Sequence, residues 1–303
     1  MKKKPTSPKV TKTSKPVKKT SPIKITADRI IDLPVKELEK LNISTISCYV
    51  NMGGESYDDM INISPDEIFA HLKKTGELAK TAAKSPDAYY NFFKQFTDKG
   101  LPIIHFAASS GTSLICSCAK MAAERLPNVY VVDTLSLSGG LALLAGYAME
   151  LIKKGQTDPK IIYELCLEKR EKLQSSFVIE TLECLHKGGR CSSLQYLAAR
   201  ILKIKPVISL DKVTGKMSPR EKHLGGYRGV LAKYIKSTFE KFPNPDLRFL
   251  YITHYCKDEA LINYFLDTVA THHKFEKVVV NLTGCNCAIH CGPNSFGMFY
   301  FQQ

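Results

Sequence analysis

The chain has 303 residues, and 44% of them are hydrophobic, so the sequence can fill the cores of two ordinary domains. Its ten cysteines, without an apolar segment near the start, favour a cytoplasmic protein with free thiols over a secreted disulfide scaffold. The net charge of +14 divides unevenly, because residues 1–24 hold nine lysines and no acid, which leaves +5 for residues 25–303. This distribution excludes a uniformly basic nucleic-acid-binding domain. The longest apolar run, residues 139–152, is too short to span a bilayer.

Residues 1–24 form a segment composed mainly of Lys, Pro, Ser and Thr. It has too few large apolar side chains to offset the entropy cost of ordering, so we predict a disordered basic tail. The tail lacks arginine and aromatic residues, which argues against base stacking and bidentate phosphate binding, and no specific nucleic-acid partner is expected. Two interpretations stay open: a solvated tail, and a tail with weak attraction to RNA or to the anionic headgroups of a membrane surface.

Residues 25–157 alternate between strand and helix patterns, which predicts an N-terminal α/β domain with a mainly parallel sheet and helices on both faces. Short apolar runs rich in β-branched residues predict strands at 44–50, 101–109 and 128–134. Ser64 and Glu67 form the Ser-x-x-Glu pattern of a capping box, so a helix is predicted to begin there. A helix of small residues is predicted between Ser138 and about Lys153.

Residues 158–303 continue the alternation and predict a C-terminal α/β domain with a mixed sheet. Helix patterns cover residues 159–177 and 227–242. Strand patterns lie at residues 177–179, 206–210, 248–255, 277–282 and 297–301.

Three loops at the ends of predicted strands combine small and polar residues. The first, "AASSGTS" at 107–113, places hydroxyl groups before a helix, where free N–H groups and the helix dipole favour an anion. Ser110 or Thr112 would add a donor, although a plain capped helix start explains the same residues. The second, "HKGGRCSS" at 186–193, presents Arg190 after a glycine turn. The third, "TGCNCAIHCGPNSFG" at 283–297, contains a histidine among three cysteines.

In this order and at these distances, the loops resemble the DegV family of bacterial fatty-acid-binding proteins. "SSGT" at 109–112 is similar to the family's Leu-Ser-Gly-Thr, and "FVIETLECLHKGGRCSS" at 177–193 to its Leu-x-x-Leu-x-x-Gly-Gly-Arg segment. "LKIKPVISLDKVTGKM" at 202–217 resembles its Lys-Pro strand and glycine turn, and "AIHCGPNSFG" at 288–297 its His-x-Gly-Pro-Gly motif. The resemblance covers residues 25–303 and implies the two-domain α/β fold of that family.

The resemblance also implies a function. The family encloses a long-chain fatty acid in a tunnel and holds its carboxylate where the two domains meet. Such a protein is a carrier and not an enzyme, needs no cofactor or metal, and presents the carboxylate to the catalytic subunit of a separate ATP-dependent fatty acid kinase, which forms the acyl phosphate. The matching motifs imply that the carboxylate is bound by Thr81, Ser110, Gly111, Thr112 and His290, and that Arg190 lies near the head group and faces the kinase.

This sequence departs from the family's motifs at several hydroxyl positions. Ala82 replaces the serine of the family's Thr-Ser-x-Pro motif, and Phe106 and Ala107 replace the serine pair before Leu-Ser-Gly-Thr. The family's opening Thr-Asp-Ser is Ala-Asp-Arg at 27–29. Asn294 replaces the last glycine of His-x-Gly-Pro-Gly, and we expect the turn to survive because asparagine tolerates a left-handed backbone. The lost hydroxyls leave open an altered ligand, weaker binding or another role.

Two alternatives concern the third loop. The side chains of Cys285, Cys287, His290 and Cys291 are zinc ligand types, but a Cys-x-Cys pair on a strand would point both thiols to one face, while adjacent His290 and Cys291 would diverge. Cys291 beside His290 also suggests a hydrolase-type enzyme with a thiolate nucleophile, although no residue can be assigned to orient the histidine. Buried thiols that fill small core spaces explain the cysteines without either function.

Overall fold

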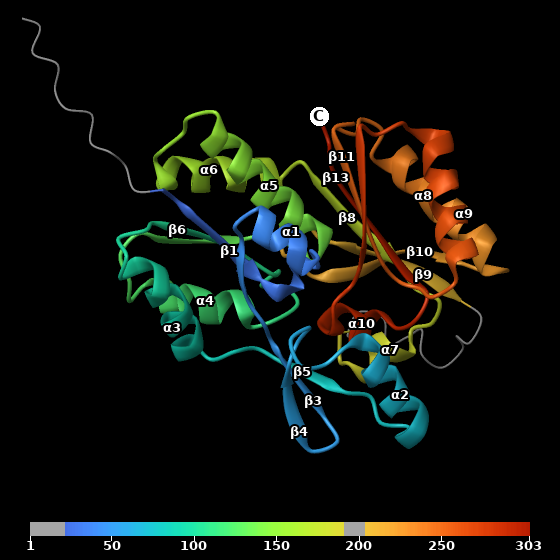
Figure 1. Ribbon diagram of the computed structural model, residues 1–303. Helices are drawn as coiled ribbons and strands as arrows, with labels where there is room; N and C mark the ends of the chain where they lie inside the picture. The colour runs from blue at the N-terminus through green and yellow to red at the C-terminus, as the bar shows by residue number, and fades with distance from the viewer. Residues whose placement is uncertain (1–21, 191–203) are drawn as a thin grey trace, which may run out of the picture.

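The computed structural model describes residues 22–190 and 204–303, so the tail predicted for residues 1–24 lies almost wholly outside the described residues (Figure 1). The described residues form a four-stranded, a six-stranded and a three-stranded sheet. Helices pack against the two larger sheets, which confirms an α/β fold. No helix in these two ranges is long and apolar enough to cross a membrane.

The four-stranded sheet comes from the N-terminal part of the chain and has the strand order β2-β1-β6-β7. Its strands are β1 (Lys24–Asp28), β2 (Ser44–Ile46), β6 (Ile103–Ala107) and β7 (Val129–Asp133), and β1 is followed by the short helices η1 (Arg29–Ile31) and α1 (Val35–Lys40). Its pairings are parallel, as predicted. One face carries α3 (Pro86–Thr97) and α4 (Ile115–Ala123), and the other carries α5 (Gly139–Lys153) and α6 (Pro159–Arg170) (Figure 1).

A small antiparallel sheet projects from this layer. It contains β3 (Tyr49–Met52), β4 (Glu55–Asp58) and β5 (Lys80–Ala82), with α2 (Pro65–Thr75) between β4 and β5. The capping box at the start of α2 is confirmed, because Glu67 N donates to Ser64 Oγ at 3.4 Å and Ser64 N donates to Glu67 Oε2 at 2.8 Å. The single strand predicted for residues 44–50 is wrong. The chain divides there into β2 and β3, because β3 pairs with β4 across a tight turn at Gly53 and Gly54, whose φ angles are 61° and 86°.

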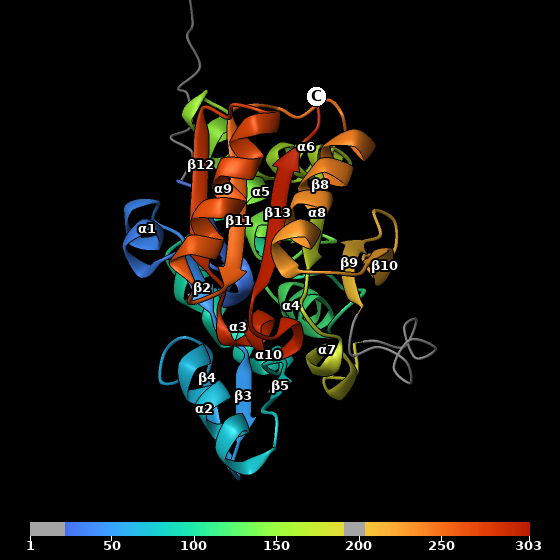
Figure 2. The ribbon, with the colours of Figure 1, turned by 90° about the vertical axis from the view of Figure 1, so that its right-hand side faces the viewer.

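The six-stranded sheet has the order β10-β9-β8-β13-β11-β12. Its strands are β8 (Leu173–Val178), β9 (Lys205–Leu210), β10 (Met217–His223), β11 (Phe249–Tyr255), β12 (Lys277–Leu282) and β13 (Ser295–Phe301). The pair β11–β12 is parallel and the others are antiparallel, which confirms the predicted mixed sheet. The helices of this part are α7 (Glu183–Lys187), α8 (Tyr227–Lys241), α9 (Glu259–His272) and α10 (Cys285–Cys291), and α8 and α9 lie in front of β11 and β13 in Figure 2.

The helix predicted for residues 159–177 is too long. The structure ends α6 at Arg170 and uses residues 173–178 as β8, in which every side chain is buried. Because β8 pairs with both β9 and β13, sheet pairing outweighs the local helix pattern at these residues.

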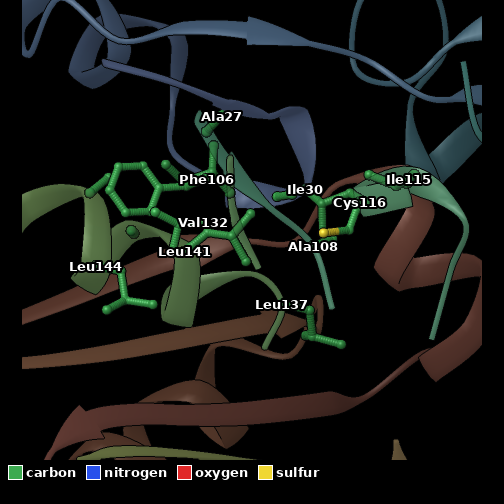
Figure 3. Close-up of a cluster of buried hydrophobic side chains, with 14 of the residues drawn as sticks. Ala27, Ile30, Phe106, Ala108, Ile115, Cys116, Val132, Leu137, Leu141 and Leu144 are labelled. Carbon is green, nitrogen blue, oxygen red and sulfur yellow. The ribbon is translucent and has the colours of Figure 1, made fainter. Parts of the chain in front are cut away.

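Helix α5 packs between the four-stranded and the six-stranded sheet. It contacts β1 and β6 on one side and β11 and β13 on the other. Leu141 and Leu144 of α5 lie beside Phe106 and Val132 of the four-stranded sheet (Figure 3). At its start the helix comes so close to β13 that a Cβ on Gly139 would lie 2.7 Å from the Phe299 ring. The two layers therefore share one apolar core, and the division predicted at residue 157 stays a prediction.

Candidate functional site

The third loop of the sequence contains a helix, α10, where a Cys-x-Cys strand was expected. Two buried carboxylates from the N-terminal part hold its start. Asp59 accepts from Cys285 N at 2.8 Å and from Asn286 N at 3.1 Å, and Asp32 accepts from Gly284 N at 2.8 Å. These acceptors satisfy the free N–H groups of a helix start, which is why the segment is helical and not extended.

Asp32 links three parts of the chain through one side chain. It accepts from Ser138 Oγ before α5 at 2.5 Å and from Thr283 Oγ1 at 2.6 Å, in addition to Gly284 N. Burial raises the pKa of Asp32 to about 6, although the hydrogen bonds from Ser138, Thr283 and Gly284 act in the opposite direction. The carboxylate thus fixes the position of α10 relative to η1 and α5.

His290 lies on α10 and meets β5, which is 209 positions earlier in the sequence. Its Nε2 is 3.0 Å from Thr81 Oγ1, while its Nδ1 is buried and has no hydrogen-bond partner among the described residues. Burial, and then the nearby Arg190 charge, lower the pKa of His290 to about 3, so the ring is neutral. Gly188 leaves the ring its space, because a Cβ there would lie 2.9 Å from His290 Cε1 and nearer still to Nδ1.

The turn after α10 returns the chain to β13. Gly292 has a φ of 76° and Asn294 a φ of 55°, so both have the positive φ that few residue types adopt readily. The prediction that Asn294 keeps this turn is confirmed, and its side chain adds a bond from Nδ2 to Glu180 Oε2 at 2.8 Å.

His290 and Arg190 line the same pocket, which has a volume of about 30 Å³. Thr112, Ser113 and Asn286 complete its polar lining, and the apolar lining includes Ile30, Leu137, Cys287 and Cys291. Arg190 is half-buried, and its Nη1 donates to Gly188 O at 2.8 Å. A positive charge, hydroxyl groups and a neutral imidazole therefore meet beside apolar side chains, a combination that suits an amphipathic anion.

The loop at 107–113 contributes Ala108, Thr112 and Ser113 to the pocket. Thr112 and Ser113 line the pocket, whereas the Ser110 side chain is exposed and its N–H donates to Asp133 Oδ1 at 3.2 Å. Gly111 packs against the turn between β9 and β10. The sequence did not lead us to predict the Ser113 hydroxyl group or the Asn286 amide at this pocket. Only Ser113 could have been expected, because it is a further hydroxyl residue in the same loop.

A buried carboxylate also fixes the start of this loop. Asp28, at the end of β1, accepts from Ala108 N at 2.7 Å and from Tyr89 Oη at 2.5 Å. It also lies 3.3 Å from Nε2 of His105 on β6. Asp28 thus holds the loop against the sheet.

The cysteines of α10 face different surroundings. Cys285 Sγ donates to Ile63 O at 3.4 Å, while Cys287 and Cys291 lie one helical turn apart along the pocket. No group of three or more His, Cys, Asp or Glu side chains in residues 22–190 and 204–303 could hold a metal ion. Burial raises the pKa of both pocket thiols well above the ordinary range, which disfavours the thiolate that a nucleophile requires.

The model of a family of uncharacterised proteins, the DegV family, matches residues 22–303. The chain belongs to the DegV family. A DegV domain-containing protein of Clostridium perfringens is 27% identical over 291 residues, covering 93% of this chain and 99% of that protein. A protein of Thermotoga maritima named fatty acid-binding protein is 25% identical over 282 residues, covering 91% and 96%. The solved structure of a DegV family protein from Thermus thermophilus, described by its fatty acid binding, is 24% identical in sequence to this chain. The match covers 93% of this chain and 100% of that chain with a TM-score of 0.84, so the two proteins share a fold.

Proposed function

We propose that this DegV protein is a cytoplasmic carrier that binds one long-chain fatty acid and presents its carboxylate to the catalytic subunit of a fatty acid kinase. The observation that carries the proposal is the convergence of Arg190, His290 and Thr112, from three separate segments, on one pocket with an apolar side. The relatives named for fatty acid binding, from Thermotoga maritima and Thermus thermophilus, support the same ligand class.

In the proposed complex, the carboxylate lies among Arg190, His290 and the loop that contains Ser110, Gly111 and Thr112. Thr112 and Ser113 supply hydroxyl donors, and the half-buried Arg190 adds a charge that solvent screens and that stays available to the kinase. Thr81 does not line the pocket, so we assign it the positioning of the His290 ring through Nε2. A bound carboxylate would favour the protonated imidazole and raise its pKa from the low value that burial imposes.

The acyl chain needs more space than the pocket has, because about 30 Å³ holds roughly one water molecule. Leu137, Cys287 and Cys291 also line a second pocket, which includes Phe177, Phe296 and Phe299. We propose that the chain displaces these shared side chains and joins the two pockets into one tunnel. Burying ~16 carbons at ~0.8 kcal/mol each contributes roughly 12 kcal/mol before ordering costs, which can offset such a rearrangement.

Fatty acid binding is tested by extraction of lipid from the purified protein. We expect mass spectrometry to find about one long-chain fatty acid per chain, because the tail-derived free energy retains such a ligand through purification. The delipidated protein should then bind a fluorescent fatty acid. A protein without bound acyl chains that also fails to bind a panel of fatty acids would contradict the proposal.

The kinase role predicts different defects for Arg190→Ala and His290→Ala. Arg190 is half-buried, so its loss should cost about 1 kcal/mol of fatty acid binding or less, but should strongly lower acyl phosphate formation with a partner kinase. His290→Ala should lose ~1.5–3 kcal/mol of head-group interaction and the positioning needed for phosphoryl transfer. Affinity and kinase-coupled turnover are measured for both, with Lys187→Ala on α7 as the control for loss of a nearby exposed charge. The roles would be reversed if Arg190→Ala abolished binding while His290→Ala changed neither quantity.

A further inference from the structure

The second pocket has polar as well as apolar lining residues. Thr253 and His254 come from the end of β11, Thr283 follows β12, and Ser295 begins β13. These four residues share the pocket with the aromatic rings of Phe177, Phe296 and Phe299. A tunnel that served only a hydrocarbon would need no polar groups at this depth.

Three of these polar groups have unused hydrogen-bonding capacity. His254 Nδ1 accepts from Cys256 N at 3.2 Å, so in the neutral ring the proton lies on Nε2, and burial lowers the pKa of His254 and favours this form. No hydrogen bond within the described part of the chain involves His254 Nε2, Thr253 Oγ1 or Ser295 Oγ, and none of these atoms is among the fully enclosed ones without a partner, so each can reach the pocket space. These residues are only 9%, 6% and 5% exposed, so a ligand in the pocket could use their polar atoms while the rest of each side chain stays packed.

The two other polar side chains of this pocket, Thr283 and Ser138, are already hydrogen-bonded to Asp32. Thr283 Oγ1 donates to Asp32 Oδ2 at 2.6 Å, so this hydroxyl group stabilises the fold and its proton is not available to a ligand. The ring of His254 is itself fixed, because it stacks on Phe296 with a centroid distance of 5.7 Å and an interplanar angle of 22°. A held imidazole N–H beside two free hydroxyl groups forms a small hydrogen-bonding site.

This site lies beyond the head-group pocket along the proposed tunnel. The two pockets share Leu137, Cys287 and Cys291, and the cysteines lie one turn apart on α10, the helix that carries His290. A chain with its carboxylate at His290 that passes this row of side chains reaches Thr253, His254 and Ser295. Because Cys287 and Cys291 span only about 6 Å along α10, the polar groups face an inner part of the acyl chain, between its head group and its far end.

We propose that this DegV protein accepts long-chain fatty acids with a hydroxyl group on an inner carbon of the chain, and that His254, Ser295 and Thr253 bind that hydroxyl. The proposal rests on the proposed function, since it extends the same tunnel. The ligand hydroxyl would accept a hydrogen bond from His254 Nε2–H and donate one to Ser295 Oγ or Thr253 Oγ1. In a wholly apolar tunnel the same hydroxyl would leave its hydrogen bonds to water uncompensated, at a cost of about tenfold or more in affinity.

The test compares the affinity of hexadecanoic acid with the affinities of its monohydroxy derivatives, which carry the hydroxyl at successive inner carbons, on the delipidated full chain. We expect at least one hydroxy acid to bind as tightly as its plain counterpart. His254→Phe keeps an aromatic ring beside Phe296 but removes the N–H, and Ser295→Ala removes one hydroxyl. Each should weaken that hydroxy acid about tenfold more than it weakens the plain acid, because only the hydroxy acid loses a hydrogen bond. His273→Phe is the matched control, because the His273 ring packs against the Phe239 ring with a centroid distance of 4.7 Å, and neither residue lines this pocket.

The outcomes separate this inference from the proposed function. Wild-type protein that binds the plain acid but binds every hydroxy acid at least about tenfold more weakly would overturn the hydroxyl site and leave the carrier function intact. Equal losses for plain and hydroxy acids in both variants would also overturn it, since a structural role affects both ligands alike. Failure of the wild type to bind any acid would overturn the proposed function and this inference with it.

Discussion

Gly111→Ala is expected to destabilise the protein by about 3 kcal/mol, measured as the free energy of unfolding in urea. A Cβ at this position would lie 2.6 Å from Lys216 N and nearer still to Thr214 O and Gly215 C. These are backbone atoms of the turn between β9 and β10, so no side-chain rotation can relieve the overlap. The glycine is required because two backbones from different sheets approach each other here.

The control for Gly111→Ala is Gly229→Ala in α8. A Cβ on Gly229 would meet nothing within 4 Å, and alanine is favoured over glycine inside a helix by about 0.5–1 kcal/mol. We therefore expect this variant to be neutral or slightly more stable. Equal destabilisation of the two variants would show that the contact between the 107–113 loop and the β9–β10 turn does not hold the layers together.

Acidification of the delipidated protein from about pH 7 to about pH 5 is expected to remove roughly 2 kcal/mol of stability through His290 alone. Burial lowers the pKa of His290 from 6.5 to about 3 in the folded state. Between these two pKa values, His290 binds a proton in the unfolded chain and stays neutral in the folded chain. This contribution to stability is complete above the unfolded pKa and is lost as the pH falls from 6.5 towards 3.

His290→Gln isolates this effect, because glutamine can hydrogen-bond to Thr81 but does not titrate. We expect urea titrations of the variant to show a flatter pH dependence than the wild type. Asp32 acts in the opposite direction, since its raised pKa of about 6 makes its contribution largest at low pH and removes it as the pH rises through 6. It is present in both proteins, so it cancels in the comparison. Parallel pH curves would contradict a buried, neutral His290.

Local signals were sufficient where the structure is held by neighbouring residues. The capping box of Ser64 and Glu67 and the small-residue helix α5 both occur as predicted, because their determinants lie within a few positions of one another. The Gly-Gly turn at 53–54 had an equally local signal, and the sequence reasoning overlooked it.

The remaining errors arose where distant residues decide the structure. Helix α10 has no capping side chain of its own, and its start is held by Asp32 and Asp59, more than 200 positions earlier. The local sequence pattern of β8 predicts a helix, and the segment is a strand because it pairs with β9 and β13. The contact between Thr81 and His290 could be expected from family motifs only, because no periodicity relates residues so far apart. Asn286 at the pocket had no signal at all.

The order of the strands determines when the pocket can form as the chain leaves the ribosome. β13 is made after the other five strands of the six-stranded sheet, yet it lies between β8 and β11 in the middle of that sheet. Until residues 295–301 emerge, the facing edges of β8 and β11 stay unpaired, which is a hazard for aggregation. His290 precedes β13 by only a few residues, whereas Thr81 and its sheet are made long before. A nascent chain therefore cannot capture a ligand at this pocket, and early interruption of synthesis would leave fragments with exposed edges and no binding site.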